Sequence, residues 1–235
     1  MNARAMHYDF KSKLNKIDSE KFRNMKVPEI DWYLNEAQEM FIKMIAVPRY
    51  RQTLGFETYQ RSTDDIRTIV VNNYKTIVTP GIEPNTYIAE LPSDYMFYLA
   101  SYVECKKNSC YKRLRTVVQQ HDDKFQESAF DRSSFEWEDV NIRFFNSGIK
   151  IYTDGTFTVE EFYLDYIKFP DIISNALDST DKKYLLPDST LLDYNQPCEL
   201  PDQTHREIVD LAVYIAQISL TPDPNAKKAK MEITN

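Results

Sequence analysis

Apolar residues recur at three- and four-residue steps near both ends of the chain, a spacing that predicts amphipathic helices. From Pro28 to Val47 they form one stripe, made of Ile30, Tyr33, Leu34, Ala37, Phe41, Met44 and Ile45. Pro28 suits the first position of such a helix, where its missing N–H would have no partner. A second apolar face follows Leu200 and Pro201 and ends before Thr221, made of Ile208, Leu211, Ala212, Ile215 and Leu220. We therefore expect a long helix near each end of the chain.

The N-terminal segment predicts a shorter helix, because Phe10, Leu14 and Ile17 also lie at helical spacing. The first 26 residues hold seven lysines and arginines against three acidic residues. This segment is interpreted either as a solvated helical arm or as a basic arm that lies on an acidic neighbouring subunit or on nucleic acid. Ser62 and Asp65 have a spacing like that of a capping box and predict one more short helix.

Between residues 76 and 170 apolar and polar positions alternate, and turn residues separate the runs. Strands are predicted at 96–106, 111–118 and 141–145, and in the runs between Ile149 and Ile167. The strand at 96–106 is apolar on both sides, as expected where both faces are largely buried. Several strands at short intervals predict an antiparallel β-sandwich or small barrel.

Four connections in this region have a predicted form. Residues 91–95 contain Pro92, Ser93 and Asp94 and predict a turn between strands. Asp154 and Gly155 predict the turn of a hairpin. Residues 121–130 are expected to form a helical excursion, and residues 131–139 an acidic loop.

The predicted fold class is α+β, with a helical bundle formed by the N- and C-terminal helices and an inserted antiparallel β-sandwich or barrel. The expected parts are an N-terminal arm and helices (1–75), an inserted β-rich domain (76–170), a long acidic connection (171–198), a C-terminal helix that completes the bundle (199–220) and a tail (221–235). The connection has no clear periodicity and is longer than the roughly 12 to 15 residues of ordinary loops. It is therefore expected to be functional, partner-bound or mobile.

Composition excludes several classes of protein. Only 4 of the 235 residues are glycine, and the chain has neither a G-x-G-x-x-G nor a G-K-[ST] motif, so Rossmann and P-loop nucleotide sites are not expected. The apolar runs are much shorter than the roughly 20 residues of a membrane span. The N-terminus lacks the pattern of a signal peptide, and three cysteines suit reduced thiols in a cytoplasm. The net charge of −7 argues against a general nucleic-acid binder.

Candidate catalytic and metal-binding residues are few, and no catalytic, cofactor or metal site is predicted. Cys105, Cys110 and the triplet at 121–123 cannot complete a zinc site, and the two thiols are interpreted as small hydrophobic residues on strands. His205 is expected to be a surface or interface residue, and His7 to belong to the basic arm. Glu160 and Glu161 are expected to point to opposite faces of a strand and to be solvated.

The most basic segment lies between two predicted strands, at residues 106–115. It contains Lys106, Lys107, Lys112, Arg113 and Arg115, with Tyr102 and Tyr111 nearby. Such a hairpin could bind nucleic acid through charge and stacking. It could equally meet the acidic stretch 171–202 of a neighbouring subunit, and head-to-tail contacts of that kind close into rings.

Three segments in a fixed order carry a resemblance to a known family. They are 28–38 (PEIDWYLNEAQ) at the start of the long helix, 91–95 (LPSDY) at the entry to the β-rich region, and 199–212 (ELPDQTHREIVDLA) at the C-terminal helix. In this order the chain resembles the head-to-tail connector proteins of tailed bacteriophages over about residues 25 to 220. It is most similar to the ring or adaptor proteins, also called tail tubular proteins, of short-tailed phages, and to those of crAss-like phages.

This resemblance implies a structural virion protein without an active site. It implies a homo-oligomeric ring, often of twelve copies, that sits below the portal protein among other tail and ring proteins. Genomic DNA would pass through the ring, and the protein would be assembled in the host cytoplasm without membrane insertion. A nucleic-acid-binding or nucleic-acid-processing protein that uses the 106–115 hairpin is the alternative hypothesis, and a virion-associated hydrolase that uses Asp122 or Glu160 is a third.

Overall fold

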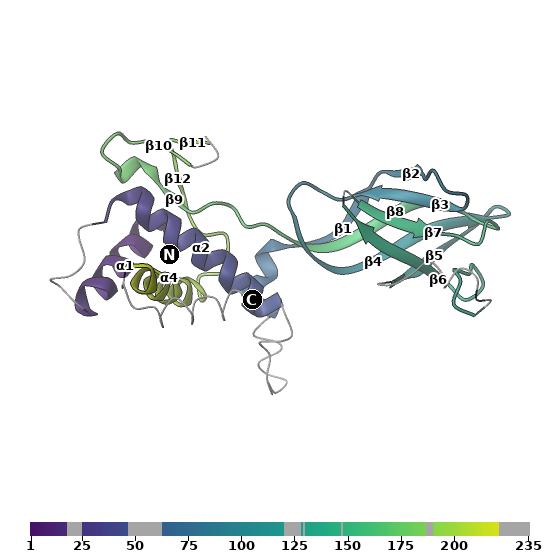
Figure 1. The fold of residues 1–235 in the computed structure, drawn as a ribbon, viewed down its shortest axis with the longest axis horizontal. Helices are drawn as coiled ribbons and strands as arrows, with labels where there is room; N and C mark the ends of the chain where they lie inside the picture. The colour runs from purple at the N-terminus through teal and green to yellow at the C-terminus, as the bar shows by residue number, and fades with distance from the viewer. Residues whose placement is uncertain are drawn as a thin grey trace, which may run out of the picture. The chain divides into compact units, whose positions relative to one another are not determined.

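The chain folds into two compact units of different character (Figure 1). The computed structural model describes residues 1–17, 25–46, 63–119, 128, 130–146, 148–186 and 190–220. The helical unit comprises Met1–Ile69 and Pro170–Asn235, and the β unit comprises Val70–Phe169. The predicted α+β class is confirmed, and each unit is described by itself below.

Three helices form the main body of the helical unit: α1 (Ala3–Ile17), α2 (Val27–Ala46) and α4 (His205–Leu220). All three were predicted, and α2 has Pro28 in its first turn as expected. The helix α4 begins later than Leu200 because residues 201–204 form a turn, in which Thr204 N and Oγ1 donate to the Pro201 carbonyl at 3.0 and 2.9 Å. A helical turn at 63–66 and η2 (Arg67–Ile69) follow the predicted cap, but Ser62 lies outside the described residues.

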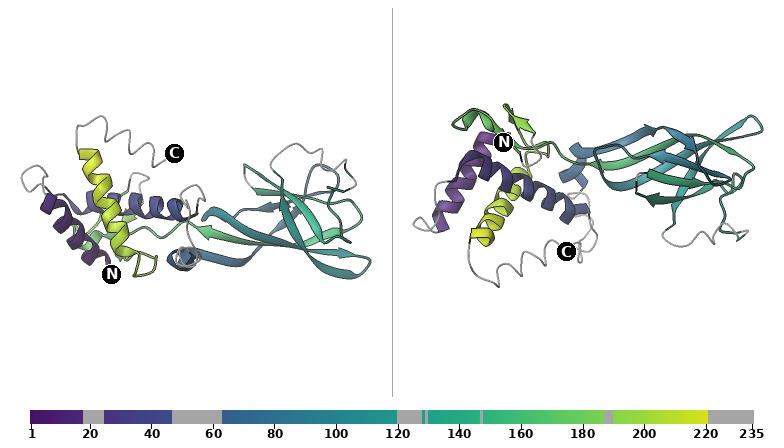
Figure 2. Two further views of the ribbon diagram at one scale, coloured as in Figure 1. Left: turned by 90° about the horizontal axis from the view of Figure 1, so that it is seen from below. Right: turned by 45° about the horizontal axis from the view of Figure 1, so that its top comes forward.

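The helix α4 packs against both α1 and α2, and Figure 2 shows the three helices from two further directions. On α1, the side chains of Met6, Phe10 and Leu14 are buried. The expectation of a solvated helical arm is therefore wrong, because the apolar face of α1 is covered by its own chain. Arg4, Lys11 and Lys13 are not buried, and whether this basic side lies on a neighbouring subunit stays a prediction.

The acidic connection is also more ordered than its sequence indicates. It contains η4 (Ala176–Asp178) and four two-residue strands, β9 (Ser174–Asn175), β10 (Tyr184–Leu185), β11 (Leu191–Leu192) and β12 (Asn195–Gln196). β9 pairs with β12, and β10 pairs with β11. Ile173, Ala176 and Leu192 are buried. Apart from residues 187–189, which are not described, this segment is a packed part of the helical unit.

The β unit is one eight-stranded sheet in the order β1-β8-β4-β5-β6-β7-β3-β2. Its strands are β1 (Val70–Thr76), β2 (Val78–Pro80), β3 (Thr86–Glu90), β4 (Tyr95–Lys107), β5 (Cys110–Val118), β6 (Asp139–Phe145), β7 (Gly148–Tyr152) and β8 (Thr158–Lys168). The predicted strands are present; of the two predicted forms, the antiparallel sandwich is absent, and the barrel is approached by a curled, half-barrel sheet. The sheet is single and mixed, because β5 and β6 run parallel, with Arg115 opposite Asp139.

The sheet is strongly curled. Only Ile77 separates β1 from β2, although these are the two outermost strands, so both edges are formed by one continuous segment of chain. The concave side encloses a core to which most of the strands contribute, with Val103, Leu114, Ile142, Ile151 and Phe162 among its buried members. The strand β4 is less buried than its two-sided apolar pattern predicts: Val103 and Cys105 are buried, whereas Leu99 is exposed.

Two of the predicted turns have different outcomes. The turn at 91–95 is confirmed: Tyr95 N donates to the Pro92 carbonyl at 3.1 Å between β3 and β4. The hairpin turn at Asp154 and Gly155 is wrong, because β7 pairs with β6 and β3 whereas β8 pairs with β1 and β4. Gly155 nevertheless has the positive φ of a turn glycine, 79°. Most of the predicted helical excursion at 121–130 lies outside the described residues.

Candidate functional site

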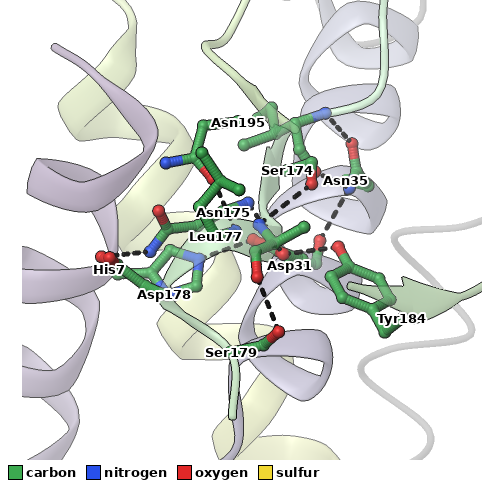
Figure 3. A network of polar contacts seen from close by, with 12 residues as sticks. His7, Asp31, Asn35, Ser174, Asn175, Leu177, Asp178, Ser179, Tyr184 and Asn195 are labelled. Atoms are coloured by element: carbon green, nitrogen blue, oxygen red, sulfur yellow. Dashed lines mark hydrogen bonds and ion pairs between the residues drawn. The ribbon is translucent and has the colours of Figure 1, made fainter. Parts of the chain in front are cut away.

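A buried polar network joins α1, α2 and the 170–198 segment (Figure 3). His7 of α1 and Asp31 of α2 are both buried, and Nε2 of His7 lies 2.6 Å from Oδ1 of Asp31. The other carboxylate oxygen, Oδ2, accepts from the Tyr184 hydroxyl at 2.5 Å and from the Asn175 backbone N–H at 3.1 Å. Burial, together with donation to Asp31, raises the pKa of the Tyr184 phenol. One carboxylate thus connects three segments that are far apart in sequence.

A polar stripe on α2 carries this network along the helix. Asp31, Asn35 and Gln38 are spaced at i, i+4 and i+7, which places them on one face. Asn35 binds both backbone groups of Ile173, accepting from its N–H at 2.8 Å and donating to its carbonyl at 2.9 Å. Gln38 donates to the Asp171 carbonyl at 3.0 Å. The stripe satisfies the backbone of a segment with little regular structure, which explains how that segment can be buried.

A groove opens above the network and has a volume of about 700 Å³. We call it the basic groove; it is lined by Arg4, His7, Tyr8, Lys11, Ser12, Val27, Asn175 and Asp178. Asn175 is 2% exposed and donates from Nδ2 to Asp178 at 3.2 Å. Its Oδ1 is buried and has no hydrogen-bond partner among the described residues. Buried acceptors of this kind are usually satisfied by an internal water.

His205 is not the surface residue that the sequence suggested. Its side chain is buried, its Nε2 lies 2.7 Å from the Leu200 carbonyl, and its Nδ1 lies 3.3 Å from the Asp202 carboxylate. Burial lowers the pKa of His205, partly offset by the hydrogen bond to the Leu200 carbonyl. The imidazole therefore holds the turn before α4 to the start of the helix, a structural position.

The three cysteines do not come together. Cys105 and Cys198 are buried, Cys110 is exposed, and all three are free thiols. Burial raises the pKa of Cys105 to about 12 and that of Cys198 to about 11, so the two buried thiols are not activated nucleophiles. Within the described parts of the chain no group of three or more histidine, cysteine or acidic side chains could hold a metal ion.

Glu160 and Glu161 do not lie on opposite faces of β8. The register shifts between Glu104, opposite Glu161, and Cys105, opposite Val159, which marks a β-bulge at Glu160. Val159 and Phe162 are both buried, so both glutamates fall on the outer side of the sheet. Glu161 binds Lys75 and the Tyr163 hydroxyl, whereas Glu160 is exposed. The two carboxylates are held apart by different partners and do not form an acid–base pair.

The basic hairpin of β4 and β5 is neutralised by its own chain. Glu136 binds Lys107 at 2.7 Å and Glu138 binds Lys112 at 3.1 Å, while Asp139 forms a two-point contact with Arg115. All three acidic residues belong to the predicted acidic loop, 131–139. The contact with Lys107 lowers the pKa of Glu136, and the contact with Arg115 lowers that of Asp139. Residues 136–139 of the same chain thus supply carboxylates to the hairpin, and a contact with the acidic stretch of a neighbouring subunit stays a prediction.

The same loop exposes two large aromatic residues that sequence reasoning did not single out. We call residues 130–138 the tryptophan loop; in it Phe130 is 98% exposed and Trp137 is 82% exposed. Glu136 and Glu138 flank the tryptophan, and their side chains remain more than half exposed despite their ion pairs. Their signal in the sequence was weak, a tryptophan and a phenylalanine within a predicted acidic loop or at its edge.

Comparison with known proteins places the chain in a family. None of the helices in the described residues has the length and apolar content that a membrane span requires. No curated protein matches the chain. A family model described as phage tail ring protein 3/4 (CrAss_Ring_3_4) matches residues 1–228. The match covers both units, including the buried network, the basic groove and the tryptophan loop. The chain therefore belongs to the phage tail ring protein family of crAss-like phages, and it is a structural component of the phage tail.

Proposed function

We propose that this chain is a non-enzymatic subunit of a ring in the portal–tail connector, where it bridges portal and tail and lines the DNA exit channel. The observation that carries the proposal is the family match over residues 1–228. The geometry of the candidate residues supports it: His7, His205 and Glu161 have hydrogen-bond partners within the chain, and burial raises the pKa of Cys105 and Cys198. We further propose that α1, α2 and α4 form one helical bundle in the assembled ring. The measurements that test the ring also test this bundle.

The distribution of charge suits a channel through which DNA must slide. The chain carries a net charge of −7, and each lysine or arginine that contacts phosphate adds salt-dependent affinity that would retain the polymer. In the basic hairpin four of the five cations are paired with acidic residues of the same chain. Internal neutralisation lets the β unit carry many charges without a strongly basic surface.

The experiment is a mass measurement of the purified protein, first alone and then with the portal protein of the same phage. A closed ring of about twelve copies, or a monomer that assembles only on the portal, is the expected result. Assembly on the portal in the host cytoplasm is part of this proposal. A stable monomer or dimer that ignores the portal would contradict it.

The alternative function, nucleic-acid binding through the 106–115 hairpin, loses its main support from the ion pairs described above. It retains one favourable observation, the stacking of the Arg113 guanidinium on Tyr102, 4.0 Å from the ring centre. Titration of DNA binding against salt distinguishes the two functions. Tight binding that weakens when Arg113 and Arg115 are reversed in charge would favour the alternative.

A further inference from the structure

Two surface features of this chain have complementary chemistry. The basic groove has three side chains of α1 at i, i+4 and i+7, namely Arg4, Tyr8 and Lys11. Arg4 lies 3.3 Å from Asp178 but its side chain stays 70% exposed. The groove therefore suits a ligand that brings negative charge and an aromatic surface.

The tryptophan loop offers both properties together. Trp137 provides an exposed ring. Glu136 and Glu138 provide the negative charge on either side of the ring. Their present pairs with Lys107 and Lys112 are exposed, and such pairs contribute little, so the carboxylates keep acceptor positions for further cations. An exposed tryptophan with an acidic border has the composition of a binding hot spot.

We propose that the tryptophan loop of one copy binds in the basic groove of the next copy around the ring. The inference rests on the proposed ring function. A contact between two different surfaces of identical chains is heterologous, and heterologous contacts generate closed rings when the rotation between copies closes. The loop and groove lie in different units, so the pairing uses both halves of the chain. The net charge of −7 adds to the argument, because a cationic groove on an acidic protein is attractive to further copies of that protein.

The geometry of the groove gives each partner a role. Arg4 and Lys11 would receive the flanking glutamates, and Tyr8, which is 76% exposed, would cover the indole ring. At about 700 Å³ the groove has room for an indole and the stems of two glutamates.

A fluorescence measurement tests where Trp137 goes. The chain has two tryptophans, so the variant Trp32→Phe leaves Trp137 as the sole reporter. We expect its emission to shift to shorter wavelength when the ring forms, and to remain that of a solvated indole in the dilute monomer. A ring whose Trp137 stays solvated would overturn the inference, and so would a shift that is present in the monomer and independent of concentration.

Charge reversal tests the partners. Arg4→Glu with Lys11→Glu, and separately Glu136→Lys with Glu138→Lys, are each expected to weaken assembly by about tenfold or more, and the combination of all four is expected to restore most of it. Lys43→Glu with Arg67→Glu is the matched control, since both residues are exposed in the helical unit and do not line the groove. Circular dichroism verifies that each variant is folded.

The outcomes separate this inference from the proposed function. If the wild type forms no ring, either alone or on the portal, both fail. If the ring forms but the reversals act no more strongly than the control, or the fourfold variant is not rescued, the ring function stands and the loop-in-groove contact is wrong.

Discussion

His7 Nε2 lies 2.6 Å from Asp31 Oδ1, and both side chains are buried. An ionised carboxylate can only accept, so the imidazole N–H donates in this contact. The Tyr184 hydroxyl and the Asn175 backbone N–H donate to the second oxygen of Asp31. Each carboxylate oxygen therefore has a hydrogen-bond partner, which offsets the cost of burying this polar group. These hydrogen bonds join α1 to α2 and both helices to the 170–198 segment.

We expect Asp31→Asn to destabilise the helical unit by about 2 to 4 kcal/mol. Three donors contact the two oxygens of the carboxylate, and an amide side chain offers only one oxygen to accept from them. Chemical denaturation followed by circular dichroism measures the change. Asp64→Asn is the control, because Asp64 is exposed and its contact with Arg67 is 3.9 Å long. Equal midpoints for the two variants would mean that the network contributes little to stability.

Burial lowers the pKa of His205 below its ordinary value of 6.5. The unfolded chain therefore binds this proton more tightly than the folded protein does, so stability that is present above pH 6.5 is lost as the pH falls toward the folded pKa. We expect the denaturation midpoint of the wild type to fall between pH 7.5 and 5.5. His205→Gln keeps a donor for the Leu200 carbonyl but does not titrate, and its midpoint should fall less over this range. A parallel decline in both proteins would assign the effect to other groups.

Removing the acidic partners of the basic hairpin should create DNA affinity. We expect Glu136→Gln with Glu138→Gln to bind duplex DNA more tightly than the wild type, with a salt dependence steeper by up to about 1.8 in log–log slope for two released lysines. Fluorescence anisotropy at several salt concentrations measures both quantities. Glu90→Gln with Asp193→Asn changes the net charge equally at exposed sites and should have a smaller effect. If the two double variants gain equally, net charge is responsible and the ion pairs are not.

Gly148 opens β7 where the backbone of β3 passes very close. A Cβ at this position would lie 2.5 Å from the Ala89 carbonyl oxygen, a backbone atom that cannot rotate away. We expect Gly148→Ala to destabilise the β unit by about 1 to 3 kcal/mol through this overlap. Gly81→Ala is the comparison: its closest contact is the Thr86 hydroxyl, a side-chain atom, so thermal denaturation should show a smaller loss. If Gly81→Ala caused the larger loss of stability, the overlap with the Ala89 carbonyl would not be the main constraint at Gly148.

Local patterns in the sequence predicted the three long helices and most strands of the β unit, but not their partners. The apolar stripe of α2 predicted its position, and alternation predicted the strand at 141–145, whereas β1 and the two-residue strands at 174–196 have no clear pattern. Asp31, Asn35 and Gln38 share an i, i+4, i+7 spacing, but a polar stripe of that kind is also typical of a solvated helix face.

Other errors came from pairings over long sequence separations, which periodicity does not contain. The parallel pairing of β5 with β6 places Arg115 beside Asp139, and nothing near either residue specifies that neighbour. The bulge at Glu160 changes which face a residue occupies, because one inserted residue reverses the alternation. The exposure of Trp137 follows from the same pairing, which turns the loop before β6 toward the hairpin.

The arrangement of the two units along the chain has a consequence for the order in which they fold during synthesis. The β unit is one continuous stretch, Val70–Phe169, and is complete before α4 has been made. The helical unit needs α1, which precedes the β unit, to pack against α4, which follows it. Because domains fold as units while the ribosome advances, the β unit closes before α4 is available to cover the apolar face of α1. A subunit competent to join a ring therefore exists only once α4 has been made.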